Sequence, residues 1–145
     1  MRQKRPDRTL GARHDDFWGW CEKGELRLQE CATCAKVLWP VMQACDGCGG
    51  DTFSWRQLSG RGRVVSWGTF VQDYYRGLLD VPYDTILVEL EAGPLFIANP
   101  DGFNEAETEW GMPVAVRFMD CEDSAGPFRL PVFAIATGDA TALGE

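Results

Sequence analysis

Residues 31–48 have the sequence CATCAKVLWPVMQACDGC and contain two Cys-x-x-Cys pairs, Cys31 with Cys34 and Cys45 with Cys48, separated by ten residues. Each pair directs two thiolates at one point, and two pairs supply the four sulfurs that tetrahedral Zn²⁺ takes at about 2.3 Å. The spacing therefore predicts one structural zinc ion per chain.

Four such cysteines have three other uses: disulfides, a redox dithiol, or a rubredoxin-type iron site. A reducing cytoplasm disfavours disulfides, and a redox motif needs only one pair. Iron takes the same four sulfurs, so the spacing leaves zinc and iron open. With four protein ligands the site is closed, so we expect it to hold structure and to activate no water. Cys21 and Cys121 lie apart from the pairs and are expected to be small buried hydrophobes.

The residues on either side of the cysteines predict a β-ribbon. Leu26 and Leu28 alternate with polar residues as a strand that leads to the first pair. A return strand is expected at 37–40, and a third strand at 53–55 leaves the second pair. Residues 25–58 thus predict a rubredoxin-like zinc ribbon, which lacks a core of its own and folds on its metal.

A short amphipathic helix is expected before the ribbon. Phe17, Trp20 and Cys21 recur at positions i, i+3 and i+4, and Asp15 and Asp16 offer an N-cap.

The chain has two regions of opposite charge. Residues 2–13 carry five basic residues and one acidic residue, and the remainder carries 9 basic and 21 acidic residues, a net charge of −12. No apolar stretch follows the basic residues, so they predict neither a secretory signal nor an anchor but a disordered, solvated arm. No apolar run approaches the ~18 residues of a membrane span. We therefore expect a cytoplasmic protein without a membrane span.

After Ser59-Gly60-Arg61-Gly62 the sequence changes to short β-rich runs separated by Gly and Pro. Five such strands predict a small closed barrel of the OB type. The expected fold is mainly β, with an N-terminal helix, a rubredoxin-like zinc ribbon and a C-terminal five-stranded OB-fold barrel. The expected strands are 63–71, 85–90, 95–98, 114–118 and 132–136. The expected units are 1–24 (basic tail and helix), 25–58 (zinc ribbon), 59–137 (barrel) and 138–145 (C-terminal tail).

Residues for independent catalysis are scarce. His14 is the single histidine, and it is remote in sequence from every candidate nucleophile. Gly60 and Gly62 lack the Lys-Ser/Thr of a phosphate-binding loop, so a tight turn explains them. Acidic residues at 105–109 have the pattern of a solvated face. We predict no catalytic residue and no turnover by the isolated chain.

The segment 72–83 is a long loop rich in aromatic residues. It carries Tyr74, Tyr75 and Arg76, residue types enriched at the centres of interfaces. The alternative is that these residues simply cover one mouth of the barrel. Trp18 and Trp20 pose the same question, because one helical face cannot bury both of them together with Phe17. These residues and Arg61 are the predicted contacts with a ligand or partner: Trp18, Trp20, Arg61, Tyr74, Tyr75 and Arg76.

The order of motifs resembles a family of acyl-CoA-associated proteins that combine a zinc ribbon with an OB fold, long catalogued as a domain of unknown function. The resemblance rests on the cysteine pairs, Ser59-Gly60-Arg61-Gly62, Val88-Glu89-Leu90 and Gly111-Met112-Pro113-Val114, and it spans about residues 14–136. It implies a non-catalytic subunit that forms a hetero-oligomer with a thiolase-like enzyme, such as a thiolase, aldolase or acyltransferase. It also implies that the subunit helps to form the acyl-CoA site of that enzyme, in lipid metabolism.

The main alternative is a single-stranded nucleic-acid-binding module, because zinc ribbons and OB barrels both serve that use. Charge separates the two hypotheses: from Arg61 onward the chain has 5 basic and 14 acidic residues, whereas a nucleic-acid groove is basic. Nucleic acid is therefore disfavoured as the partner. An iron-containing electron carrier is the third hypothesis, and it would give a red preparation.

Overall fold

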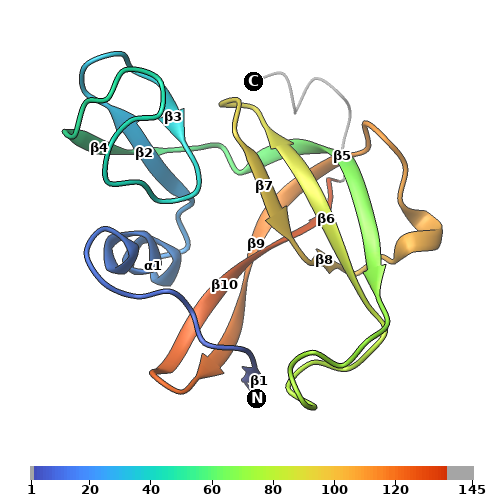
Figure 1. Ribbon diagram of the computed structural model, residues 1–145. Coiled ribbons are helices and arrows are strands. Elements are labelled where there is room, and N and C mark those ends of the chain that lie inside the picture. The colour runs from blue at the N-terminus through green and yellow to red at the C-terminus, as the bar shows by residue number, and fades with distance from the viewer. Residues whose placement is uncertain (1, 137–145) are drawn as a thin grey trace.

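The computed structural model describes residues 2–136 of the chain. The helix and a small sheet lie on one side of the molecule, and a larger curved sheet lies on the other (Figure 1). The C-terminal tail expected at 138–145 lies outside the described residues. The elements are β1 (Gln3–Lys4), α1 (His14–Glu22), β2 (Arg27–Cys31), β3 (Val37–Leu38), β4 (Phe53–Gln57), β5 (Arg61–Phe70), β6 (Tyr83–Leu90), β7 (Leu95–Ala98), β8 (Pro100–Asp101), η1 (Glu105–Glu107), β9 (Pro113–Asp123) and β10 (Gly126–Ile135).

The small sheet carries the cysteine pairs. Its central strand, β2, runs antiparallel to β3 and to β4. Leu28 and Leu38 are buried, and so is the polar side chain of Gln29. Gln29 donates to the carbonyl of Met42 at 2.8 Å and accepts from the amide of Met42 at 2.7 Å. The side-chain amide thus ties the segment between the cysteine pairs to the central strand, and the three predicted ribbon strands are confirmed.

The large sheet has the order β7-β6-β5-β9-β10-β8, with β1 added to β9. Only Asn99 separates β7 from β8, and β8 pairs with β10, so the sheet bends round to bring its first and last strands together. Each of the five predicted strands is present, and the short strands β1 and β8 were not predicted. The predicted fold class, mainly β with an N-terminal helix, a ribbon and an OB-type barrel, is confirmed.

The hairpin of β9 and β10 is much longer than expected from the sequence. Its pairing is continuous from Val114 opposite Ile135 to Asp123 opposite Gly126. Cys121 and Phe128 lie opposite each other and are both buried, which explains why the strands continue beyond the barrel. In the sequence, the charged residues next to Cys121 and Phe128 conceal the alternation of apolar and polar residues that predicts a strand.

The turn before β5 and the start of that strand each require a glycine. Gly60 has a φ of 79°, which L side chains rarely adopt. A Cβ added to Gly62 would lie 2.5 Å from the carbonyl oxygen of Glu89 and 2.7 Å from Cγ1 of Val88. Close packing between neighbouring strands therefore explains the Ser-Gly-Arg-Gly segment.

Helix α1 begins differently from the prediction. Arg13 is the N-cap residue, with a φ of 70° and no side-chain capping bond. Asp15 accepts a hydrogen bond from the amide of Gly11 at 3.0 Å, so its carboxylate stabilises the preceding turn rather than capping the helix. Expecting Asp15 or Asp16 as the N-cap was wrong because the turn at 11–13 makes Arg13 the N-cap, two residues before Asp15.

One hydrophobic core joins the helix, the ribbon and the barrel. The ring of Trp39 from the ribbon lies 4.7 Å from Phe17 of the helix and stacks at 4.6 Å on Phe96 of β7. Trp18 packs edge-on against Phe128 of β10 at 5.4 Å. These contacts fix the ribbon against the barrel through aromatic side chains.

The basic N-terminal segment is ordered, contrary to the expectation of a disordered arm. Residues 2–8, which we name the N-terminal strap, follow the exposed edge of β9. β1 pairs in parallel with Cys121 and Glu122, and Arg8 forms an ion pair with Asp123 at 2.7 Å. The segment is held in place because the edge of β9 offers backbone groups and an acidic residue at the same point. Within residues 2–136, no helix has the length and apolar character needed to cross a membrane.

Candidate functional site

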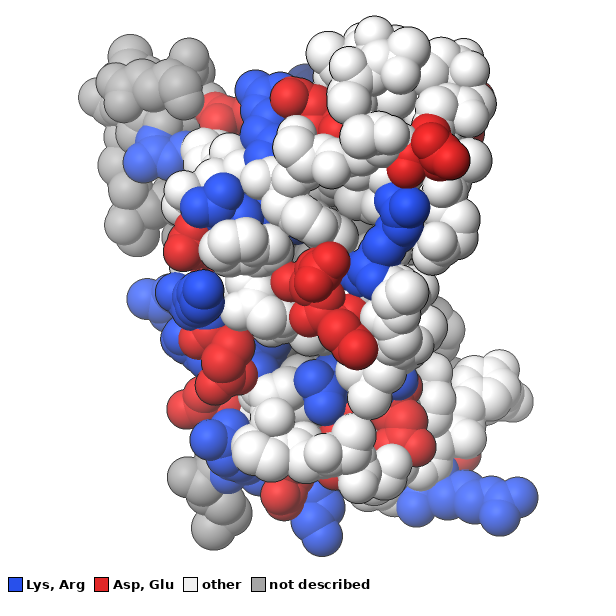
Figure 2. All heavy atoms as spheres, turned by 90° about the vertical axis from the view of Figure 1, so that its left-hand side faces the viewer, with Lys and Arg blue, Asp and Glu red and all other residues white. Residues whose placement is uncertain are grey.

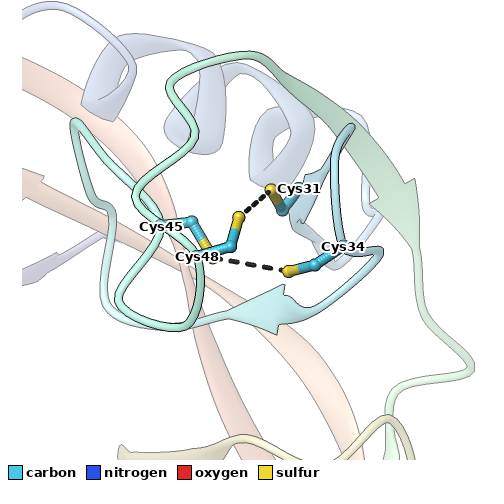
Figure 3. A group of neighbouring side chains, drawn as sticks. All are labelled: Cys31, Cys34, Cys45 and Cys48. Carbon is cyan, nitrogen blue, oxygen red and sulfur yellow. Dashed lines mark hydrogen bonds between the residues drawn. The ribbon is translucent and has the colours of Figure 1, made fainter.

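The four paired cysteines converge on one point. Cys31, Cys34, Cys45 and Cys48 place their sulfur atoms within 4.8 Å of one another (Figure 3). The sulfurs of Cys31 and Cys48 are 3.5 Å apart, and those of Cys34 and Cys45 are 3.7 Å apart. Sulfurs bound at about 2.3 Å to a tetrahedral metal lie about 3.8 Å from one another, so the observed spacing fits such a site.

Local turns hold each cysteine pair in this arrangement. The amide of Ala35 donates to the carbonyl of Cys31 at 2.8 Å, and the amide of Gly49 donates to the carbonyl of Cys45 at 2.8 Å. Ala35 and Gly49 both have positive φ values, 65° and 80°. A Cβ on Gly50 would lie 3.4 Å from the sulfurs of Cys31 and Cys48. The glycine therefore leaves room for the sulfurs to approach each other.

Backbone amides favour the thiolate form at two of the cysteines. The amide of Cys34 is the largest influence on Cys31 and helps to lower its pKa to about 6. Burial opposes ionisation of Cys45, but the amides of Gly47 and Cys48 outweigh it and the pKa is lowered. The amide of Gly50 acts to lower the pKa of Cys48, yet the neighbouring thiols of Cys31 and Cys34 raise it to about 12.

An ion pair links the two cysteine turns beside the cluster. Lys36 follows the first cysteine pair and forms an ion pair with Asp46 of the second pair at 2.7 Å. Hydrogen bonding to Asp46 raises the pKa of Lys36, because the contact favours the charged ammonium group. The four thiols can hold a metal ion such as zinc, and they fill its tetrahedral positions, which suits a structural role.

The predicted contact residues of the long loop lie at the surface. In Figure 1 the segment between β5 and β6 extends away from the barrel. Tyr74 is 64% exposed, and Tyr75 is 43% exposed. Arg76 is exposed and has a φ of 51°, within the turn where the carboxylate of Asp73 accepts from the amide of Gly77 at 2.9 Å. This local turn leaves both tyrosine side chains partly exposed.

Only two of the predicted contact residues meet at a common cavity. Trp18 and Tyr75 both line a cavity of about 420 Å³ between the helix, the ribbon and the barrel. Trp20 lies elsewhere on the helix, and the guanidinium of Arg27 covers its ring at 4.2 Å. The structure thus separates the two tryptophans that the sequence had grouped together.

Arg61 lies in a separate hollow of about 210 Å³ at the junction of ribbon and barrel. Its backbone amide donates to Ser59 Oγ at 3.2 Å, and Ser59 in turn hydrogen-bonds Glu91. Within residues 2–136, its Nη1 atom is buried without a hydrogen-bond partner. The hollow is therefore distinct from the cavity lined by Trp18 and Tyr75.

Sequence reasoning missed several residues of the larger cavity. Trp39 and Phe96 form part of its wall, and Arg5 and Arg8 line it from the N-terminal strap. For Trp39 a signal was available in the sequence, because a large aromatic residue followed by Pro40 comes directly after a short strand. The arginines carried no signal, because their position depends on pairing with β9 far along the chain.

A four-cysteine ribbon joined to a small OB-type barrel defines the class of this protein. Residues 55–119 match the family model of the C-terminal OB-fold domain of ChsH2. The chain resembles this family over its OB-type barrel. This agrees with the acyl-CoA-associated family to which the sequence motifs pointed.

Two curated proteins are similar to the chain. One is a probable enoyl-CoA hydratase alpha subunit of Thermomonospora curvata, 29% identical over 83% of this chain and 37% of that protein. The other is a DUF35 domain-containing scaffold protein of Pyrococcus furiosus, 32% identical over 66% of this chain and 62% of that protein. The chain therefore spans less than two thirds of the length of either relative.

Solved structures that are similar to the chain include the following two. A chain of the Ltp2-ChsH2(DUF35) aldolase has a TM-score of 0.78 and 25% sequence identity, and the match covers 90% of this chain and 100% of that chain. A DUF35 protein of unknown function from Sulfolobus solfataricus has a TM-score of 0.55 and 14% identity, covering 74% of this chain and 78% of that one. The second match shows the fold alone.

Proposed function

We propose that this chain is a non-catalytic, zinc-containing subunit of a thiolase-like enzyme. In this role it forms a hetero-oligomer with a thiolase, aldolase or acyltransferase and helps to build the acyl-CoA site of that partner. The observation that carries the proposal is the similarity over the full length of a chain from the Ltp2-ChsH2(DUF35) aldolase. The scaffold protein of Pyrococcus furiosus supports a role in assembly.

The chemistry of the chain's own residues supports a non-catalytic role. Its single histidine, His14, is the first residue of α1. Among residues 2–136 no hydrogen bond joins its side chain to a serine, cysteine or carboxylate that could form a catalytic pair with it. The four paired thiols lie together and form a complete set of four metal ligands, which leaves no open position for a substrate or water. Glu105 and Glu107 lie on an exposed 3-10 turn and not in the apolar setting that acid catalysis by a carboxyl group requires.

The loop between β5 and β6 supports a role in binding a partner. Val71 is 71% exposed, Leu78 is 43% exposed and Val81 is 38% exposed, in addition to the two tyrosines described above. Exposed apolar residues gathered in one loop are typical of interaction sites, and Tyr and Arg are enriched at interface centres. In the assembled enzyme this loop excludes water and holds the thioester against the partner's nucleophile.

The charge of the barrel region argues against nucleic acid as the partner. Residues from Arg61 onward comprise 5 basic and 14 acidic residues. On the face that carries the helix and ribbon, basic and acidic side chains are interspersed rather than gathered into a basic track (Figure 2). A gel-shift assay at low salt with a single-stranded oligonucleotide tests this point, and the expected result is no shift.

The proposal is tested by purifying the tagged chain from its native host and identifying the proteins that co-elute. We expect a thiolase-like enzyme at a fixed stoichiometry, and an acyl-CoA assay in which turnover depends on both chains. Turnover by this chain alone, or a partner of another class, would overturn the proposal. Metal analysis of the same preparation distinguishes zinc from iron.

Matched variants then test the loop. Tyr74→Ala, Tyr75→Ala and Arg76→Ala should each weaken complex formation or acyl-CoA affinity without unfolding the chain. Trp110→Ala is the control, because Trp110 is 64% exposed, as Tyr74 is, but lies outside the loop. Equal effects of the loop variants and the control variant would exclude a specific role for the loop.

A further inference from the structure

The cavity of about 420 Å³ has a size and a wall typical of a small-molecule site. Small-molecule pockets in proteins span about 300–1,000 Å³ and are mainly apolar and aromatic. Here the aromatic residues come from the helix, the ribbon, the barrel and the β5–β6 loop, among them Trp18, Trp39, Phe96 and Tyr75. The cavity therefore exists only where all four parts of the fold meet.

The aromatic wall is held rigidly in place. Phe96 stacks on Trp39 at 4.6 Å and meets Phe133 edge-on at 5.9 Å. The indole nitrogen of Trp18 donates to the carbonyl of Thr9 at 3.2 Å, which fixes that ring as well. Rings fixed in this way favour a flat or ring-bearing ligand, because they offer offset-stacked and edge-to-face contacts without rearrangement.

One positive charge at this cavity is not neutralised. Arg5 lines the cavity and forms no ion pair among residues 2–136. Its Nη2 donates to Oδ1 of Asn99 at 3.1 Å, and Asn99 is oriented by its own bond to the carbonyl of Asp84 at 2.9 Å. A guanidinium has five N–H donors, so Arg5 retains donors for an anion. Burial lowers the pKa of Arg5, which reflects the cost of a partly desolvated charge.

The other charged groups on the cavity wall are already engaged. Arg8 is paired with Asp123, at 2.7 Å from Nε and 3.2 Å from Nη2. Asp7 is exposed, and its carboxylate accepts from the amide of Ser124 at 3.0 Å. A single uncompensated guanidinium suits a monoanion, and its planar fork matches a carboxylate. A dianionic phosphate would meet no second free cation at this wall.

We propose that this cavity is a binding site for a ring-bearing apolar carboxylate, with the ring between the aromatic walls and the carboxylate on Arg5. The binding site requires no partner enzyme, because all of its walls belong to this chain. Its failure and the failure of the proposed subunit function are therefore distinguishable: the first concerns the isolated chain, and the second concerns its complex.

The test is calorimetric titration of the metal-loaded full chain with 2-naphthoate and with its neutral counterpart 2-naphthalenemethanol. We expect 2-naphthoate to bind with a Kd of about 100 µM, as fragments of this size do in well-formed pockets. The neutral alcohol should bind about tenfold more weakly, since a charge-assisted hydrogen bond is lost. Arg5→Gln should remove that difference by weakening only the carboxylate.

The control is Arg2→Gln, which removes the same charge from the same strap at an exposed position outside the cavity wall. It should leave both affinities unchanged. Amide NMR shifts on the wild-type chain provide a measurement that needs no variant, and 2-naphthoate should shift Ala98 and Asn99. Equal binding of acid and alcohol, binding insensitive to Arg5→Gln, shifts confined to other regions, or no binding below about 1 mM would each overturn the proposal.

Discussion

Replacing Asp123 with asparagine should loosen the N-terminal strap and destabilise the whole chain. The Asp123 carboxylate accepts from Nε of Arg8 at 2.7 Å, from Nη2 at 3.2 Å and from the Arg8 amide at 3.0 Å. It also accepts from the amide of Ala125 at 3.0 Å. The Asp123 side chain is 1% exposed and that of Arg8 is 11% exposed, so water cannot replace the lost carboxylate.

The size of this effect follows from that burial. Removing one partner of a buried ion pair costs about 3 kcal/mol, because the other charge remains desolvated. For a chain of this length such a loss corresponds to a fall in Tm of about 10 °C. The Arg8 guanidinium also lies 4.2 Å from the ring centre of Phe128, so its displacement would disturb the cavity wall.

The pH dependence has a definite sign. Hydrogen bonding to Arg8 is the largest cause that lowers the pKa of Asp123 to about 2. A carboxyl group with a lowered pKa stabilises the fold above its unfolded pKa of about 4, and this contribution is lost as the pH falls through about 2. The carboxyl carbon of Asp123 should therefore still show an ionised NMR shift at a pH of about 3.5.

The assay is thermal unfolding of the metal-loaded protein followed by near-UV circular dichroism, with amide exchange of Arg5 as the local readout. Asp120→Asn is the matched control, because Asp120 is 64% exposed and lies 4.0 Å from Arg2. An exposed pair of this kind contributes at most about 1 kcal/mol. If Asp123→Asn changes Tm no more than Asp120→Asn does, the strap is not held by a buried ion pair and the reasoning fails.

Three further predictions concern the metal and the packing. Cys34→Ser should abolish the stoichiometric metal, measured by elemental analysis, whereas Cys21→Ser should retain it, because Cys21 lies in the main core and not in the cluster; equal metal content in both variants would contradict the assignment. Gly62→Ala should destabilise the chain by about 2 kcal/mol or more in urea unfolding, because the added methyl group meets backbone. Gly68→Ala, which meets nothing within 4 Å, should have little effect, and similar losses in the two would refute this account. Gln29→Leu should cost about 2 kcal/mol by leaving the Met42 backbone groups unpaired, and an unchanged midpoint would argue against it.

The four-cysteine cluster and most of the strands could be predicted from the sequence because their determinants are local. A Cys-x-x-Cys turn brings two sulfurs together within four residues, and only the meeting of two such turns required the fold. The barrel strands were likewise predicted by the alternation of apolar and polar residues and by the glycines and prolines between them. The charged residues that conceal the outer part of the β9–β10 hairpin show where this local signal ended.

The tertiary structure alone decided the N-terminal strap and the aromatic cavity. The strap is ordered because Gln3 and Lys4 pair with residues near 121, and no local pattern in a basic segment encodes that pairing. The cavity combines side chains of the strap, helix, ribbon and barrel, so its walls have no sequence spacing in common. Local spacing determined the two cysteine turns that can hold a metal, whereas long-range packing determined which charge faces which aromatic ring.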